Sequence, residues 1–314
     1  MTHSHDNHNH HDHSHGSHGH HHPAPQSFNL AFAVAVSANL AYTLFQAGYA
    51  LAAGSMGLLA DAAHNFGDVC GLILAWGASW LLTLPARKRY SYGFKRTTIL
   101  AALTNALILV ASSALIAYES IYRLFHPNTV NETIVIVVAL IGIVINGGTA
   151  LLFMKGAHDD LNIKGAFLHL IGDAMISLGV VIAAILILYT KQMWIDPCVG
   201  LIIVAVILWG TRGLLRDSVR LLMDAIPHYI DQQGVENYLR NLPGVSHVHD
   251  LHIWGLSTKE VALTAHLIMP NTPLTNQDYK KINTDLKKEF RIDHATIQVE
   301  TGNDEFPCVR SEGC

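Results

Sequence analysis

Long apolar runs alternate with short polar connections over residues 28–209 of the chain. Each run is close to the roughly 20 residues that an α-helix needs to cross a bilayer. The pattern predicts six transmembrane helices, at residues 28–50, 58–82, 98–122, 133–155, 165–189 and 195–209. We therefore expect an integral membrane protein with an all-α transmembrane part.

A different pattern begins near residue 222 and is typical of a small soluble domain. A helical period over 229–242 is followed by strand-like stretches at 245–254 and 260–269, an amphipathic helix at 276–290 and a last strand at 295–300. This αββαβ order predicts an α+β fold with both helices on one face of a sheet. The expected segments are a tail (1–27), a transmembrane domain (28–216), a soluble domain (217–301) and a flexible C-terminal tail (302–314).

Histidine is concentrated in the N-terminal tail, where residues 1–27 hold eleven of the chain's 21 histidines. Apart from Met1, the tail has no aliphatic side chain longer than alanine, so it cannot bury a core and is expected to be disordered. An engineered tag is usually a uniform histidine run. The varied spacing here favours a native tail that collects divalent metal ions weakly at many sites.

Composition and charge position agree with a membrane protein. Half of the 314 residues (50%) are hydrophobic and only 14% are charged. Cationic residues gather in alternate connections and after the last run, whereas the opposite connections offer only Arg123 and Lys191. By the positive-inside rule the first set is cytoplasmic, and an even number of spans places both termini there. The cysteines form no CxxC pair, and Cys70 and Cys198 are expected to be core residues.

Two apolar runs carry the same polar pattern, a histidine followed four residues later by an aspartate. The pairs are His64 with Asp68 and His169 with Asp173. On a helix this spacing places both side chains of a pair on one face, about 6 Å apart at Cβ. An aspartate at the centre of a bilayer costs about 2.5 to 3.5 kcal/mol on insertion scales. Because the sequence offers no lysine or arginine at that depth, these aspartates need protons or a cation.

Together the two pairs supply the two imidazoles and two carboxylates that a tetrahedral Zn²⁺ takes, and binding makes the assembly formally neutral. Ligands must be deprotonated to bind zinc, so protons expel the metal and the metal expels protons. The pattern predicts an exporter in which an inward proton gradient drives Zn²⁺ outward, with Cd²⁺ tolerated. Asp61 is expected to support a ligating imidazole from outside the ligand set. Asn39, Asn105 and Asn146 are expected to form interhelical hydrogen bonds rather than to bind metal.

Two other functions remain open at this point. Zinc with nearby carboxylates also describes an intramembrane hydrolase, although catalytic zinc keeps an open coordination position and the chain has no HExxH motif. A membrane-bound zinc sensor would bind metal without moving it. Ion flux under an imposed pH gradient separates the exporter from both.

Several motifs resemble those of the cation diffusion facilitator family, in its zinc-exporting branch. They are LLADAAHNFGD (58–68), YSYGFKR (90–96), HLIGD (169–173), WIDP (194–197) and VHDLHIW (248–254). The resemblance implies a homodimeric Zn²⁺/H⁺ antiporter of a bacterial inner membrane, with zinc and protons as substrates and no nucleic-acid partner. It also implies a transport site at the two His-x-x-x-Asp pairs and a ferredoxin-like cytoplasmic domain that dimerises.

The same resemblance implies a second zinc site in the cytoplasmic domain, at His249, His266 and Glu300. These residues lie on three separate predicted strands. His247 and His252 are near enough to substitute for one of them. In some relatives a tail histidine of the neighbouring subunit completes the set.

The connections suggest further contacts. Some relatives bind metal in the loop after the second span, but residues 90–96 contain no histidine, cysteine or carboxylate, so no metal is expected there. The cations of this loop are expected to meet a carboxylate at the hinge to the soluble domain, with Asp224 the nearest. Asp196 precedes Pro197 and is expected to cap the N-terminus of the sixth span. Cys308 and Cys314 fall in the expected C-terminal tail.

Overall fold

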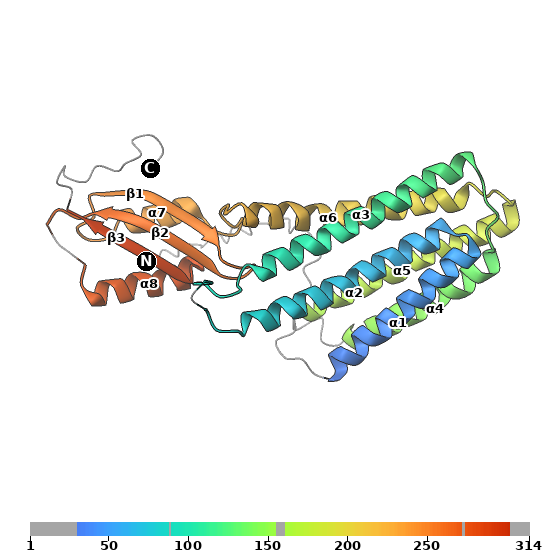
Figure 1. The fold of residues 1–314 in the computed structure, drawn as a ribbon, viewed down its shortest axis with the longest axis horizontal. Helices are drawn as coiled ribbons and strands as arrows, with labels where there is room; N and C mark the ends of the chain where they lie inside the picture. Colours follow the sequence, from blue (N-terminus) through green and yellow to red (C-terminus); the bar gives the residue numbers. More distant parts are fainter. Residues whose placement is uncertain (1–29, 88, 155–160, 272–273, 302–314) are drawn as a thin grey trace, which may run out of the picture.

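The computed structural model describes residues 30–87, 89–154, 161–271 and 274–301. The whole N-terminal tail (1–27) and the two terminal cysteines lie outside these residues. Six long helices and a small sheet domain make up the described chain (Figure 1). The long helices are α1 (Leu30–Ala53), α2 (Met56–Leu82), α3 (Thr97–Phe125), α4 (Glu132–Met154), α5 (Leu161–Thr190) and α6 (Ile195–Leu222).

All six apolar runs are therefore helices, as predicted. Within the described residues, five of them (α2 to α6) are long and apolar enough to cross a membrane, and α1 adds a sixth helix of 24 residues. The sixth run was expected to end near residue 209, but α6 continues to Leu222. Loss of apolar character marks where a helix leaves the bilayer, not where its backbone hydrogen bonds stop. The arginines after residue 209 lie on the same continuous helix.

The helices form two main pairs, α3 with α6 and α4 with α5, while α2 contacts α1, α3, α5 and α6. The soluble domain lies beyond one end of the helices, next to α3 and α6 (Figure 1). The membrane core gathers toward the opposite end, around Met56, Leu58, Val135 and Val180. This end lies on the far side of the helices from the soluble domain.

Asp196 was expected to cap the N-terminus of its own helix, α6, and this prediction was wrong. The N-cap of α6 is Trp194, without a side-chain cap, and the Asp196 carboxylate instead reaches the start of α2. It accepts hydrogen bonds from the Ser55 hydroxyl (2.5 Å) and from the amides of Met56 (2.5 Å) and Gly57 (3.3 Å). The first amides of a helix have no intrahelical partner, so a carboxylate from a neighbouring helix can satisfy them. Asp196 thereby joins the N-terminal ends of α2 and α6.

The soluble domain has the predicted αββαβ order. Its elements are α7 (Gln232–Arg240), β1 (His247–Gly255), β2 (Val261–Ile268), α8 (Asn276–Phe290) and β3 (His294–Glu300). The strand order is β1-β2-β3, with β1 antiparallel and β3 parallel to the central β2. Leu239 of α7 and Leu286 of α8 share one core with Leu263 and Leu267 of β2. Because side chains alternate along a strand, His266 points to the face opposite the helices.

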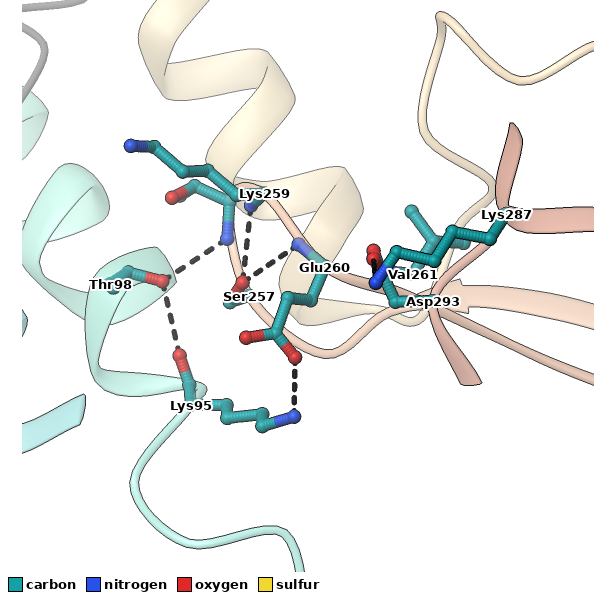
Figure 2. A network of polar contacts seen from close by, with 9 residues as sticks. Lys95, Thr98, Ser257, Lys259, Glu260, Val261, Lys287 and Asp293 are labelled. Carbon is teal, nitrogen blue, oxygen red and sulfur yellow. Dashed lines mark hydrogen bonds and ion pairs between the residues drawn. The ribbon is translucent and has the colours of Figure 1, made fainter. Parts of the chain in front are cut away.

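Three contacts attach the start of α3 to the end of α6 and to the soluble domain. Arg96 forms an ion pair with Asp224 (Nη2 to Oδ1, 2.5 Å), which confirms the expected hinge carboxylate. Lys95 pairs with Glu260 in the turn between β1 and β2, and the Thr258 amide donates to the Thr98 hydroxyl at 3.1 Å (Figure 2). The α3 helix is therefore anchored both to the end of α6 and to the sheet.

Candidate metal centres

The two His-x-x-x-Asp pairs converge at one point between α2 and α5. His64 Nε2 lies 3.8 Å from Asp68 Oδ2 on its own helix and 3.3 Å from Asp173 Oδ1 on the other. His169 Nε2 lies 3.3 Å from Asp68 Oδ2 and 3.5 Å from Asp173 Oδ2. Each imidazole thus approaches both carboxylates, one from its own helix and one from the facing helix.

These separations suit a tetrahedral cation. Ligand bonds of about 2.0 to 2.1 Å to Zn²⁺ imply ligand atoms about 3.3 to 3.4 Å apart, close to those observed between the helices. One ligand atom each of His64, Asp68 and Asp173 lies within 4.8 Å of the others, and all three residues are buried. The side chain of His169 is 14% exposed at the edge of the group. The arrangement can hold one divalent ion between two helices.

A second cluster lies on the open face of the soluble sheet. His249 and His266 are direct partners across β1 and β2. Glu300, at the end of β3, places Oε1 2.8 Å from His266 Nδ1 and Oε2 3.1 Å from His249 Nε2. One ligand atom from each lies within 4.8 Å of the other two. The structure therefore brings together the three residues that the sequence singled out in this domain.

Two family profiles cover most of the chain. Residues 32–223 match the cation efflux transmembrane domain, and residues 227–302 match the cytoplasmic, dimerisation domain of cation efflux proteins. The chain belongs to the cation diffusion facilitator family. It is accordingly a cation efflux transporter and an integral multi-pass membrane protein. The intramembrane hydrolase is therefore excluded.

Relatives within the family match over most of both chains. The metal cation efflux system protein CzcD of Cupriavidus metallidurans is 34% identical over 261 residues, which cover 82% of this chain and 81% of the relative. The cadmium, cobalt and zinc/H(+)-K(+) antiporter of Bacillus subtilis is 33% identical, with 83% and 85% covered. The zinc transporter ZitB of Escherichia coli is also 33% identical, with 79% of each chain covered.

In this family member, Asp61 lies just outside the histidine–aspartate group. It is fully buried, and its Oδ2 accepts hydrogen bonds from Gln46 on α1 (2.7 Å) and Ser177 on α5 (2.8 Å). Gln46 in turn accepts a hydrogen bond from Asn65 at 3.0 Å. Of the expected interhelical asparagines, Asn105 packs its carboxamide against Gly71 of α2. Sequence patterns alone offered no indication of Gln46 or Ser177.

Sequence reasoning also missed Asp250 in the soluble domain. The ladder between β1 and β2 is irregular between His249 and His252, and Asp250 has a positive φ of 49° there. Its carboxylate lies 2.8 Å from His252 Nε2 and 3.5 Å from His266 Nε2. The hydrogen bond with His252 holds the pKa of the Asp250 carboxyl below its usual range. His252 is therefore engaged with Asp250, while His247 stacks on His249 with ring centroids 6.2 Å apart.

Proposed function

We propose that the protein exports Zn²⁺ from the cytoplasm in exchange for protons, by alternating access to one site formed by His64, Asp68, His169 and Asp173. The observation that carries the proposal is the convergence of these four side chains from two separate helices, with nitrogen–oxygen separations of 3.3 to 3.8 Å. A site divided between two helices can change its exposure when the helices move.

The charge balance of the four-ligand site explains why Zn²⁺ would be exchanged for protons. Two carboxylates and two neutral imidazoles around Zn²⁺ sum to zero, which removes most of the cost of holding the ion in low dielectric. The same carboxylates cannot stay buried and unpaired once the ion leaves, because uncompensated charge in the membrane is costly. Protons replace the metal at these side chains, and the proton gradient thereby favours metal release on the far side.

Ligand type supports zinc as the substrate. Imidazole nitrogen suits zinc and its neighbours, whereas a site made only of carboxylates would suit harder ions. The names of the relatives include zinc, and that of the Bacillus subtilis protein adds cadmium and cobalt. We propose Zn²⁺ as the main substrate, with Cd²⁺ as a tolerated one.

The soluble domain extends the proposal. His249, His266 and Glu300 hold a second Zn²⁺ that is not transported, and the domain joins two copies of the chain into a homodimer. The match of residues 227–302 to a dimerisation domain supports this assembly. The domain lies on the cytoplasmic side of a bacterial inner membrane, as do residues 1–27 and 302–314.

Proteoliposomes with a zinc indicator and a pH indicator inside test the proposal. The full chain should move Zn²⁺ with an opposing movement of protons. Asp173→Asn should abolish both, whereas the same change at Asp231, where asparagine can cap α7 as aspartate does, should retain them. Zinc binding without zinc movement would favour a sensor, and zinc movement without protons would overturn the antiport.

A further inference from the structure

We propose that Gln46, Asp61 and Ser177 form a clasp that closes the non-cytoplasmic side of the transport site and has to open before the metal can leave. The proposal rests on the proposed function, since it assigns the clasp to one side of the same site. In this assignment Asp61 is a positioning residue. It acts through the distance between α2 and α5 and does not bind the metal.

The clasp lies one helical turn from the ligands on both helices. Asp61 precedes His64 by three residues on α2, and Ser177 follows Asp173 by four residues on α5. The two helices run in opposite directions, so both positions fall on the same side of the site. That side faces away from the soluble domain, toward the start of α2 at Met56.

The hydrogen bonds of the clasp link three helices, α1, α2 and α5. Asp61 Oδ2 accepts from Gln46 Nε2 of α1 at 2.7 Å and from Ser177 Oγ of α5 at 2.8 Å. All three residues are 0% exposed. Hydrogen bonds to an ionised carboxylate are about twice as strong as those between neutral groups, and little water competes at this depth. Because α5 packs mainly on α4 and much less on α2, the Ser177 bond adds to a small α2–α5 junction that otherwise contains the ligand contacts.

A fourth helix, α4, packs next to the clasp residue Ser177. A Cβ atom placed on Gly142 of α4 would lie 2.2 Å from the Tyr42 hydroxyl oxygen and 3.2 Å from Ser177 Oγ. A side chain at this position would have to displace the Tyr42 ring, so the α4 backbone lies close to the clasp. At this level α4 therefore packs next to α1 and α5.

Packing on the two sides of the site is unequal. In α2, every buried residue lies between Met56 and Val69, except Ala78. In α5, Val180 and four further residues beyond Ser177 are buried, whereas none of residues 167–172 is. On the cytoplasmic side, a cavity of about 540 Å³ lies between α2, α3, α6 and the turn after β1, and it extends along α2 to Gly71, three residues past Asp68. Along α2 and α5 the buried residues are thus concentrated on the side of the ligands where the clasp lies.

Side-specific labelling tests the clasp in the full-length protein. Val180, 1% exposed and three residues beyond Ser177, is replaced by cysteine in a background whose four native cysteines are serine. A membrane-impermeant maleimide is applied to intact cells or to inverted membrane vesicles. Ser177→Ala removes only the hydroxyl that joins α5 to α2. It should raise labelling at position 180 about five-fold from the non-cytoplasmic face and leave labelling from the cytoplasmic face unchanged, since a lost bond of about 1 kcal/mol corresponds to that factor.

The matched control is Ser113→Ala on α3. Ser113 is 1% exposed, and its hydroxyl has no hydrogen-bond partner in the described structure, so its loss should change labelling from neither face. Gln46→Leu removes the other donor to Asp61 and should act like Ser177→Ala, which keeps the test decisive if one variant fails to fold. Unchanged labelling in both clasp variants, or an equal rise from both faces, would overturn the clasp. Labelling does not need transport, so a parent protein that moves no zinc would refute the proposed function without deciding this one.

Discussion

The two metal-binding clusters use similar side chains on very different supports. The membrane cluster joins side chains from α2 and α5, two helices that have little other contact with each other than this cluster and the Ser177–Asp61 bond. The soluble cluster places His249 and His266 opposite each other on hydrogen-bonded strands, with Glu300 on the strand next to them. Helices can slide or tilt without breaking their own hydrogen bonds, whereas paired strands cannot separate without losing theirs. The supports therefore fit the proposed roles, a transport site that changes its exposure in the membrane and a fixed site in the soluble domain.

The largest effect is expected from Asp68→Asn in the membrane cluster. Removing one charge leaves Zn²⁺ uncompensated in a buried site, a loss of about 3 kcal/mol or more, which corresponds to about 100-fold or more in affinity. Initial zinc flux in proteoliposomes should fall at least as much. The matched change in the soluble cluster, Glu300→Gln, should keep more than about a tenth of the flux. Similar losses in both variants would remove the distinction between the clusters.

A smaller effect on transport, but a large one on binding, is expected from His266→Ala. Its two ring nitrogens face Glu300 and Asp250, so the soluble cluster loses its central ligand. Equilibrium dialysis of the full chain should show one zinc ion fewer per chain, or that ion bound on the order of 10-fold more weakly. Saturating zinc flux should persist. Loss of two ions per chain would mean that the clusters bind cooperatively.

A modest effect on zinc flux is expected when the ion pair that attaches α3 to the end of α6 is removed. The Arg96–Asp224 pair is half exposed, with side-chain exposures of 49% and 51%, and such pairs contribute only about 0.2 to 1 kcal/mol. Asp224→Asn should therefore change zinc flux less than about five-fold. Raising salt should reduce the difference from the parent, because exposed pairs are screened. A salt-independent loss of flux would show that Asp224 acts through something other than this pair.

The smallest effect is expected from Asp250→Asn. Asparagine tolerates the left-handed backbone that the irregular strand needs, so the fold is retained while the negative charge near His266 is lost. Zinc at the soluble cluster should bind a few-fold more weakly, and flux should not change. Isothermal titration of the full chain measures the first effect, and the flux assay measures the second. A drop in binding as large as that of His266→Ala would place Asp250 among the ligands.

Much of the fold follows from local pattern. A run of about 20 apolar residues predicts a membrane helix because backbone groups in lipid must bond within the segment. Alternation of period two placed His249 and His266 on strands, and the four-residue spacing of His64 and Asp68 placed them on one helix face. Asp224 could be predicted because opposite charges gather near the hinge. These predictions depend on neighbours along the chain.

Other features depend on which helix faces which. The Ser177–Asp61 bond joins residues 116 apart in sequence, and the Ser55–Asp196 bond joins residues 141 apart. A polar residue in an apolar run signals that it needs a partner but not where the partner lies. For that reason Asp196 was assigned to its own helix, and Gln46 and Ser177 went unnoticed.

The amino-acid sequence by itself determined the membrane helices and the order of the soluble domain, since each is encoded by spacing and polarity within one segment. It also indicated the candidate metal-binding side chains. Only the tertiary structure decided that the two histidine–aspartate pairs meet, that Asp61 connects α1 to α5, and that Asp250 turns toward His266. The physical reason is that packing between elements depends on side-chain shape and on buried hydrogen bonds across long sequence separations. No periodic pattern along one element records those contacts.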